Sequence, residues 1–247
     1  MYRDTMRIEM KRMIKHLVLK AFAVLFRDDG PKVVYYHDVG TSYTDMGTPI
    51  ELLKAHVACA RRMGFSFESK LEDLNAPKKL LMCFDDGFRG LWDERDYFFQ
   101  EGIFPTVFIA VDLVGRSGYL GWDEIRELQR HGFVFQSHTW SHRPLTDVPD
   151  GELLHELADA RKAIGVELGH DPDMLCFPCG MHSQKVVEAA KSAGYRKLFA
   201  SYPGCVTSDE LLVPRNLVQN LAAADFAHVV HGALCPLRNR YVRQHVR

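Results

Sequence analysis

The sequence predicts an α/β barrel in a single domain, because short apolar runs alternate with helical patterns along most of the chain. Strands that alternate with helices of this length form parallel βα units. The expected strands are residues 32–37, 80–84, 106–111, 133–137, 174–177, 197–200 and 212–213. About seven such units in one chain favour a barrel over an open sheet.

Five helical patterns lie between these strands, and each ends directly before a glycine. Glycine adopts the left-handed conformation that commonly terminates a helix. The expected helices are residues 50–63, 91–101, 122–131, 151–168 and 183–193, followed by Gly64, Gly102, Gly132, Gly169 and Gly194. The repeated stop signal supports the division of the chain into βα units.

The composition is that of a folded domain without a nucleic-acid partner. The chain has 247 residues, 47% hydrophobic content and a formal net charge of −1. We expect the barrel in residues 31–247, preceded by a separate element in residues 1–30. The neutral balance lacks the basic footprint of a nucleic-acid-binding protein and favours an uncharged or weakly charged substrate.

Six cysteines are scattered through the chain. Cys176 and Cys179 form one Cys-x-x-Cys pattern, but no second copy accompanies it. A zinc or redox role for this pair is therefore the weaker interpretation. Cys83, Cys176 and Cys205 lie in or beside apolar runs, where free cysteine behaves as a small hydrophobe. We expect mostly reduced thiols in a cytoplasmic enzyme.

Residues 1–30 combine basic and apolar side chains. Residues 17–26 are apolar apart from Lys20, but this stretch is shorter than the ~20 residues that span a bilayer. No small-residue cleavage site follows it, so an amphipathic helix is favoured over a secretory signal. Two alternatives stay open. The helix packs on the barrel, or it lies on the inner membrane surface with Arg12, Lys15 and Lys20 near the headgroups.

Two carboxylates and two histidines follow two of the expected strands. Asp85 and Asp86 end one apolar run, and His138 and His142 end another. Each pair alone has a structural alternative, since an aspartate can cap a helix and a histidine can be a core or surface residue. Together they contain the His, His, carboxylate set of catalytic zinc, which leaves a position open for water. Three could hold one divalent metal while the fourth acts as a base, which predicts metal-assisted hydrolysis.

Other chemically active side chains fall at the same ends of expected strands. His37 and Arg215 follow the first and last strands, and Cys179 follows the strand at residues 174–177. Barrels of this kind carry their active sites at the carboxyl ends of the strands. We therefore expect one shared rim. The alternatives are a core histidine bonded to a backbone carbonyl for His37 and a surface ion pair for Arg215.

At these motifs the chain resembles the polysaccharide deacetylase family, the NodB-homology carbohydrate esterases, from about residue 32 to residue 218. Residues 84–87 and 138–142 carry the D-D-G and H-[ST]-x-x-H patterns, and residues 175–180 look like the third motif. Trp122 fits the Trp-x-x-[IL] helix common in the family. The resemblance implies a distorted (β/α)7 barrel and metal-dependent removal of acetyl groups from N-acetylated sugars.

The resemblance also implies roles for individual residues. Asp85 would be the catalytic base, and the backbone N–H of Cys179, after Pro178, would bind the oxyanion. The metal ligands would be Asp86, His138 and His142. This set accepts Zn²⁺, which we expect, and also Co²⁺, Ni²⁺ or Fe²⁺.

Three features depart from the family pattern. Cys176 stands where many members have an arginine that pairs with the base, and Cys179 replaces the usual aromatic residue. No C-terminal Leu-x-His supplies the general acid. Members similar to the poly-N-acetylglucosamine deacetylases open with a Y-H-x-V strand, and residues 36–39 match it, so His37 would be the acid.

Two further residues complete the expected site. Arg215 would supply the missing positive partner of Asp85, and His182 would reach the substrate. The expected function is an N-deacetylase that releases acetate from an N-acetylated saccharide, which is its expected partner. The alternatives are an O-deacetylase or other amide hydrolase, or a catalytically weak carbohydrate-binding protein. The identity of the saccharide and the oligomeric state stay open.

Overall fold

The computed structural model describes residues 2–40, 46–207 and 209–246, without the side chains of residues 2–9 and 12. All seven expected strands are present in one nine-stranded sheet, and every pairing in it is parallel. The strands are β1 (Lys32–Tyr36), β4 (Ser66–Glu68), β5 (Lys79–Phe84), β6 (Thr106–Ile109), β7 (Val134–Ser137), β8 (Met174–Cys176), β9 (Lys197–Phe199), β10 (Leu212–Val213) and β11 (Arg215–Leu217). The short strands β2 (Asp38–Val39) and β3 (Gly47–Thr48) form a separate pair. The α/β class is therefore confirmed.

The two edges of the large sheet are consecutive in sequence. The strand order is β10-β9-β8-β7-β6-β5-β1-β11, with β4 beside β5. Val213 pairs with Phe199 of β9, and Arg215 pairs with Val33 of β1. Between them stands Pro214, which has no N–H to continue a ladder. Residues 212–217 thus run from one edge of the sheet to the other, but in the described part of the chain β10 and β11 do not pair, so this pairing does not close the barrel.

The five expected helices are present with two differences of shape. The helices are α2 (Ile50–Arg62), α3 (Gly90–Asp93), α4 (Arg95–Glu101), α5 (Trp122–Arg130), α6 (Asp150–Leu154), α7 (Ala160–Leu168) and α8 (Gln184–Ser192). The helix expected at 91–101 is divided at Glu94 into α3 and α4. The helix expected at 151–168 contains a π-helical turn, His155–Asp159, between α6 and α7. All five glycines predicted as helix stops have a positive φ.

Several elements were not expected from the sequence. They are β4, β11, α9 (Ala223–Val230) and α10 (Arg238–His245). The strands are three residues long, so their periodicity is too short to recognise. The basic C-terminal segment forms α10, and the His245 carbonyl accepts the backbone N–H of His182 at 3.0 Å.

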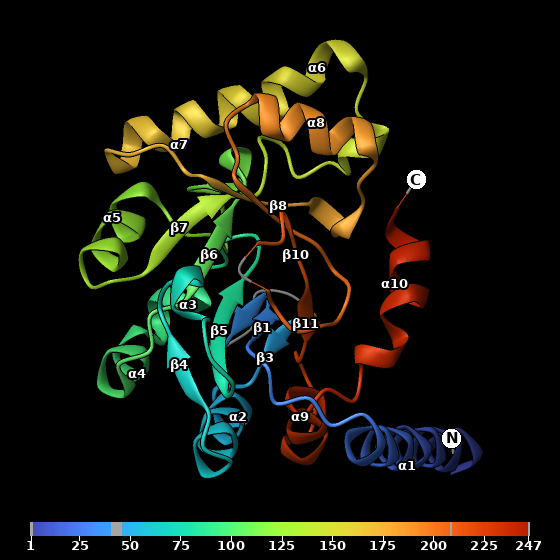
Figure 1. The fold of residues 1–247 in the computed structure, drawn as a ribbon. Coiled ribbons are helices and arrows are strands. Elements are labelled where there is room, and N and C mark those ends of the chain that lie inside the picture. The colour runs from blue at the N-terminus through green and yellow to red at the C-terminus, as the bar shows by residue number, and fades with distance from the viewer. Residues whose placement is uncertain (1, 41–45, 208, 247) are drawn as a thin grey trace.

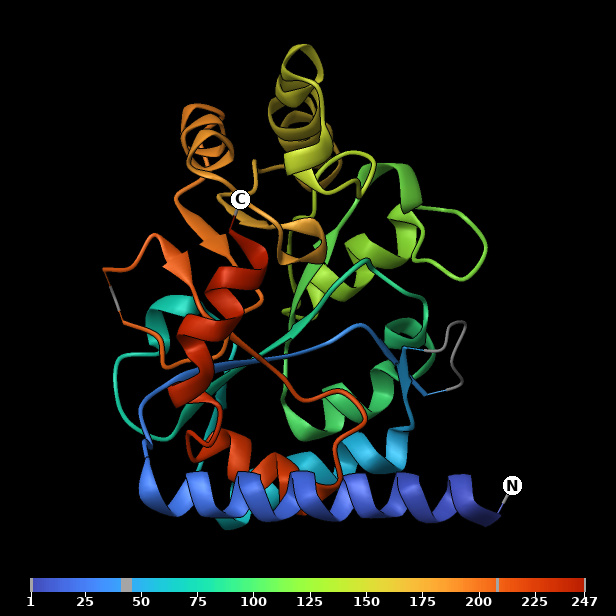
Figure 2. The ribbon, with the colours of Figure 1, turned by 90° about the vertical axis from the view of Figure 1, so that its right-hand side faces the viewer.

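The N-terminal helix α1 (Tyr2–Leu25) lies along one edge of the molecule and packs on α9 (Figures 1 and 2). Leu19 and Ala23 are buried in this contact, and His16 Nδ1 lies 2.7 Å from the Asp225 carboxylate. The remaining helices surround the sheet, as Figure 1 shows. In the described part of the chain, none of the helices combines the length and apolarity that a membrane span requires.

Side chains alternate along the strands between the barrel interior and the helices. The interior cluster includes Val33, Tyr35, Leu81, Cys83 and Val213. Their neighbours Val34, Tyr36, Leu80 and Met82 belong to the larger cluster beneath the helices. This two-residue period decides which side chains reach the interior at the strand ends.

Candidate active site and metal centre

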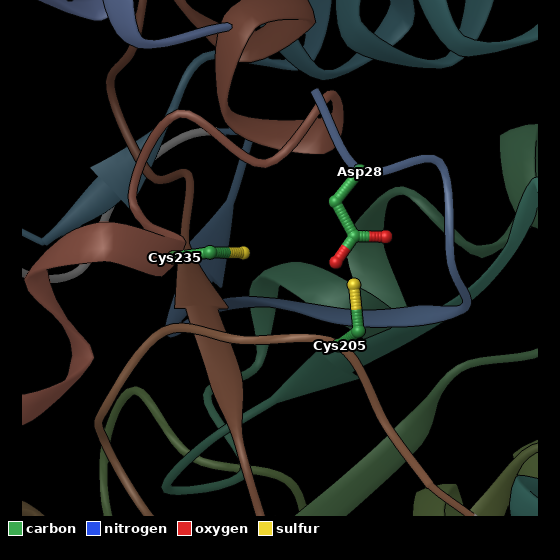
Figure 3. A group of neighbouring side chains, drawn as sticks. All are labelled: Asp28, Cys205 and Cys235. Atoms are coloured by element: carbon green, nitrogen blue, oxygen red, sulfur yellow. The ribbon is translucent and has the colours of Figure 1, made fainter. Parts of the chain in front are cut away.

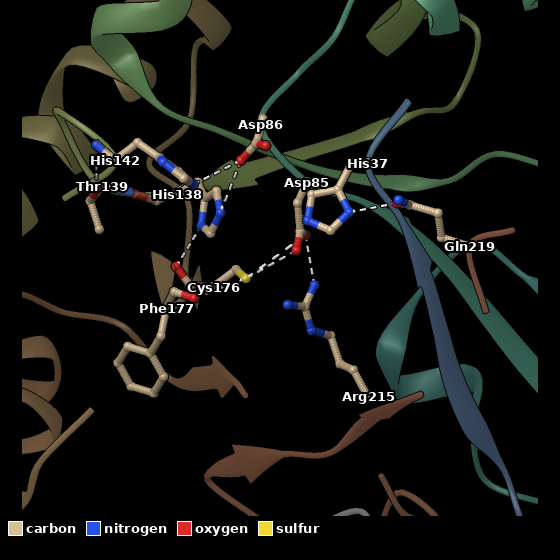
Figure 4. Close-up of polar contacts among 11 residues, drawn as sticks. His37, Asp85, Asp86, His138, Thr139, His142, Cys176, Phe177, Arg215 and Gln219 are labelled. Atoms are coloured by element: carbon tan, nitrogen blue, oxygen red, sulfur yellow. Dashed lines mark hydrogen bonds and ion pairs between the residues drawn. The ribbon is translucent and has the colours of Figure 1, made fainter. Parts of the chain in front are cut away.

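The strand period places three expected site residues over the barrel interior. Asp85 continues the interior positions 81 and 83 of β5, and Arg215 continues position 213. His37 continues positions 33 and 35 of β1. Figure 4 shows that the three side chains lie together, although His37 comes from the first strand of the sheet and Arg215 from the last.

Asp85 and Arg215 form a buried ion pair. Arg215 Nη1 donates to Asp85 Oδ1 at 2.6 Å, and the two residues are 1% and 3% exposed. The Arg215 guanidinium also lies 4.2 Å from the Tyr35 ring centre, and its Nε donates to the Ala200 carbonyl at 3.3 Å. Arg215 therefore occupies the position of positive partner that the sequence suggested, rather than a surface ion pair.

The environment of Asp85 favours its charged form. Burial alone would raise the pKa of Asp85, but Arg215 and, more weakly, His138 and His37 lower it below the ordinary value. Cys176 stands where many relatives carry the arginine. Its Sγ lies 3.8 Å from both Asp85 carboxylate oxygens, and burial raises the pKa of the thiol well above its ordinary value. Cys176 thus stays a neutral donor, and Arg215 supplies the charge.

Asp86, His138 and His142 converge on one point. Both histidine Nε2 atoms face Asp86 Oδ1, at 3.3 Å from His138 and 2.9 Å from His142. The three possible ligand atoms all lie within 4.8 Å of one another. Asp86 and His138 are buried, and His142 is partly exposed, so one side of the group is open to solvent.

The hydrogen bonding of His138 shows that this group suits a cation. His138 Nδ1 lies 2.8 Å from the Cys176 carbonyl oxygen, which accepts only if Nδ1 carries the proton. In the neutral imidazole, Nε2 then directs a lone pair at Asp86, whose oxygen also carries only lone pairs. A proton or a metal ion must separate them. A histidine whose second nitrogen donates to a carbonyl is the usual arrangement at a metal.

The backbone of this centre adopts an unusual conformation. Asp86, Thr139, His142 and Cys179 all have positive φ angles between 56° and 73°. Such conformations cost about 1–3 kcal/mol each in a non-glycine residue and concentrate at functional sites. Gly87 also has a positive φ of 74°, and a larger residue would be strained there because its Cβ would stand 2.9 Å from Ile109 Cγ2. The D-D-G turn therefore aims Asp85 and Asp86 at the cost of backbone strain.

Glu156 holds the histidine loop and was not anticipated from the sequence. Its carboxylate is 1% exposed and accepts the backbone N–H groups of Trp140 at 3.1 Å and Ser141 at 3.0 Å, and the Ser141 hydroxyl at 2.5 Å. Arg143 donates to it at 3.2 Å. Burial opposes ionisation, but the Ser141 and Arg143 bonds lower the pKa of Glu156 below its ordinary value. Glu156 lies on the π-helical turn of the structure, a feature that often marks functional sites but that the sequence did not reveal.

His37 points toward Asp85, as expected. Its Nδ1 donates to Gln219 Oε1 at 2.8 Å, and the ring lies beside Asp85 (Figure 4). The partner is therefore a side-chain amide rather than the backbone carbonyl considered as the alternative. Tyr36 points the opposite way, and its hydroxyl lies 3.0 Å from His56 Nδ1 beneath α2. Gln219 carried no sequence signal, because it meets His37 only through the pairing of β1 with β11.

The third motif forms a tight turn after β8. Pro178 is buried, and Cys179 is exposed with φ 56°. His182 does not reach an open site as expected. It is 2% exposed, stacks on Phe177 at 4.8 Å, and its Nδ1 lies 3.0 Å from the Gly180 carbonyl oxygen. His182 supports the turn from behind, so we do not include it among the substrate-binding residues.

A second group of possible ligands lies away from this rim. Asp28, Cys205 and Cys235 also bring their ligand atoms within 4.8 Å of one another (Figure 3). The hydrogen bond from Cys205 lowers the pKa of the Cys235 thiol to about 7. The Lys32 ammonium acts on both thiols, and a fixed positive charge there opposes a divalent cation. All six cysteines are free thiols in the structure.

Comparisons with known proteins identify the family and agree with this fold. The sequence profile of the polysaccharide deacetylase family matches residues 73–198, just over half of the chain. The chain is 23% identical over 187 residues to the protein YxkH of Bacillus subtilis (strain 168), itself named for this family, covering 72% of this chain and 67% of YxkH. The chain therefore belongs to the polysaccharide deacetylase family.

Solved structures show the same fold. The IcaB structure from Ammonifex degensii aligns with a TM-score of 0.74 and 22% identity, covering 83% of this chain and 99% of IcaB. The Streptococcus pyogenes deacetylase PplD, solved in complex with acetate, aligns with a TM-score of 0.73 and 16% identity, covering 81% and 97%. The likeness confirms the NodB-type α/β architecture of this chain.

Proposed function

We propose that this protein is a metal-dependent deacetylase that removes the N-acetyl group of an N-acetylated saccharide and releases acetate. The observation that carries the proposal is the pair of histidine Nε2 atoms facing one oxygen of Asp86, directly beside the ion-paired Asp85. The complex of PplD with acetate, the product of deacetylation, supports the same reaction class.

Asp86, His138 and His142 would hold the metal, and Zn²⁺ suits this ligand set best. When bound, the metal polarises the acetyl carbonyl and lowers the pKa of a water molecule. Asp85 accepts the proton of the attacking water, because Arg215 keeps the carboxylate ionised. In the tetrahedral intermediate the exposed turn at Cys179 offers its backbone N–H to the oxyanion.

The departing amine needs a proton as the C–N bond breaks, and we assign this role to His37. Its Nδ1–H is held by Gln219, so the imidazolium form would carry its second proton on Nε2 and transfer that proton to the amine, which leaves the neutral ring. The amide and one water are consumed, and acetate and a free amino sugar are formed. The Asp85–Arg215 pair favours an enzyme over a protein that only binds carbohydrate, because it keeps a carboxylate ionised beside the group that would hold the metal.

The test is acetate release from N-acetylglucosamine oligomers by purified protein. We expect turnover that a chelator abolishes and added Zn²⁺ restores. Asp86→Ala should lose both bound metal and turnover. Parallel assays with O-acetylated sugars separate the O-deacetylase alternative. Release that is insensitive to chelator, or confined to O-acetyl esters, would reject the proposed reaction.

A further inference from the structure

Helix α1 has two apolar faces, and the described residues of the protein cover only one of them. The inner face packs on α9 through Leu19 and Ala23, which are 5% and 7% exposed. On the opposite side of the helix, the large apolar side chains between residues 10 and 25 are 45–74% exposed. We define the outer face of α1 as Met10, Met13, Ile14, Leu17, Val18, Ala21, Val24 and Leu25.

The outer face is continuous and carries no charge. At 100° per residue these eight positions fall within one arc of about 140°, and no other residue between 10 and 25 falls in it. Lys20 borders the arc on one side and Lys11 on the other, each about 20° from its edge. Both lysines are exposed. An exposed apolar stripe with lysines on both borders can lie in a membrane interface, with the stripe among the acyl chains and the lysines at the level of the headgroups.

The charge of the helix identifies the kind of surface. Between residues 10 and 25 there are four basic residues and no aspartate or glutamate. Lys15, like Lys11 and Lys20, is exposed, and the side chain of Arg12 lies outside the described side chains. Two copies of α1 meeting through their outer faces would bring like charges together. A surface of anionic phospholipid complements the same charges.

We propose that the outer face of α1 binds the surface of a membrane that contains anionic phospholipid. The apolar stripe enters the boundary between headgroups and acyl chains, and Lys11 and Lys20 meet the lipid phosphates. Figure 2 shows α1 along one edge with the rest of the protein on one side of it, so the barrel does not obstruct this contact. This proposal is independent of the reaction assigned to the active site.

Co-sedimentation of the full chain with lipid vesicles tests the proposal. We expect binding to vesicles of phosphatidylcholine with about a third phosphatidylglycerol, and at least tenfold weaker binding to phosphatidylcholine alone. Ile14→Glu/Leu17→Glu should abolish binding. Lys11→Gln/Lys15→Gln/Lys20→Gln should weaken it and reduce its dependence on salt, because fewer charges remain to be screened.

A matched control uses exposed apolar residues elsewhere. Leu154 on α6 and Val166 on α7 are 69% and 75% exposed. Leu154→Glu/Val166→Glu changes the surface equally and should leave vesicle binding unchanged. The proposal would be overturned if Leu154→Glu/Val166→Glu lost vesicle binding as fully as Ile14→Glu/Leu17→Glu does. It would also be overturned if the unaltered protein did not bind the vesicles. Light scattering that shows a dimer disrupted only by Ile14→Glu/Leu17→Glu would assign the face to self-association instead.

Discussion

At the scale of single residues, the charge of Asp85 depends on a partner 130 positions later in the chain. Burial alone would raise the pKa of Asp85, but the charge of Arg215 lowers it below the ordinary value of an aspartate. The ionised form can accept a proton, whereas the neutral form cannot. The pair therefore connects the fold directly to the proposed chemistry.

Asp85→Asn should separate catalysis from metal binding. The amide keeps the shape of the side chain but cannot take a proton, so turnover should fall by on the order of 10²–10⁴. Metal content, measured on the purified variant, should stay near that of the unaltered protein because Asp86 and both histidines remain. Near-normal acetate release by the variant would show that Asp85 is not the base.

Arg215→Met should destabilise the protein by about 3–5 kcal/mol, because it leaves the buried Asp85 charge unpaired. Urea unfolding measures this change. The double variant Asp85→Asn/Arg215→Met removes both charges and should recover part of the loss. If the losses of unfolding free energy in the two single variants simply add in the double variant, the two side chains do not interact.

His37→Ala should reduce turnover while metal binding stays unchanged. The side chain lies beside Asp85 and is held by Gln219, but it does not belong to the Asp86 group. Gln219→Ala is the comparison, since it releases the His37 ring without removing it and should have the smaller effect. Equal metal loss and activity loss in His37→Ala would point to a structural role.

The sequence predicted the candidate site residues that stand in short motifs or directly at strand ends. It missed Glu156 and Gln219, which join the site through tertiary contacts and stand in no motif. Asp85, Asp86, His138 and His142 stand in short motifs at strand ends, so their grouping follows from the barrel. Glu156 reaches the His138 loop from a later helix, and no spacing in the sequence indicates this contact. His182 stands next to the third motif, but its position in the sequence could not show that the ring packs inward.

At the scale of elements, the π-helical turn between α6 and α7 positions Glu156 under the histidine loop. The sequence predicted one continuous helix there, because its apolar positions persist from 151 to 168. The extra residue in the π-helical turn rotates the side chains of α7 about the helix axis relative to those of α6. A regular helix would present a different side chain to the loop that carries His138 and His142.

Glu156→Gln should lower metal affinity by about 10–100-fold, the usual effect of losing a partner that orients the ligands. It should also change the pH dependence of stability. The folded pKa of Glu156 is lowered, so its stabilisation is present above the unfolded pKa of about 4.3 and is lost as the pH falls through the folded value.

The variant should therefore be less stable than the unaltered protein at pH 7, and the difference should shrink below pH about 4. Unfolding curves from pH 3 to pH 7 measure this. Glu188→Gln is the matched control, since that carboxylate is half exposed and, among the described residues, pairs with Gln184 and Lys191 on its own helix. A constant difference across this range would mean that the charge of Glu156 is not responsible.

At the scale of the whole molecule, α1 forms part of the wall of a cavity that reaches the active site. This cavity of about 300 Å³ is lined by Lys15 and Leu19 of α1 and by Tyr35, Arg215 and Gln219 of the rim. Helix α1 contributes no strand to the sheet. It nevertheless contacts the barrel, because its side chains line this cavity.

Deletion of residues 1–27 should leave a folded chain that is about 2–4 kcal/mol less stable, because the burial of Leu19, Ala23 and part of Phe22 is lost. Urea unfolding and circular dichroism measure stability and folding. Keeping Asp28 preserves its backbone bond to His231. A chain that aggregates without α1 would show that the helix is mainly a cover for the barrel.

The link between β10 and β11 has a consequence for how the protein matures during synthesis. Asp85, Asp86, His138 and His142 are synthesised before the strand that carries Arg215. A nascent chain that ends before Pro214 contains the three proposed metal ligands, but it lacks Arg215, the counter-charge of Asp85, and β11, the partner of β1. On the proposed mechanism, we therefore expect a fragment left by interrupted translation to lack turnover.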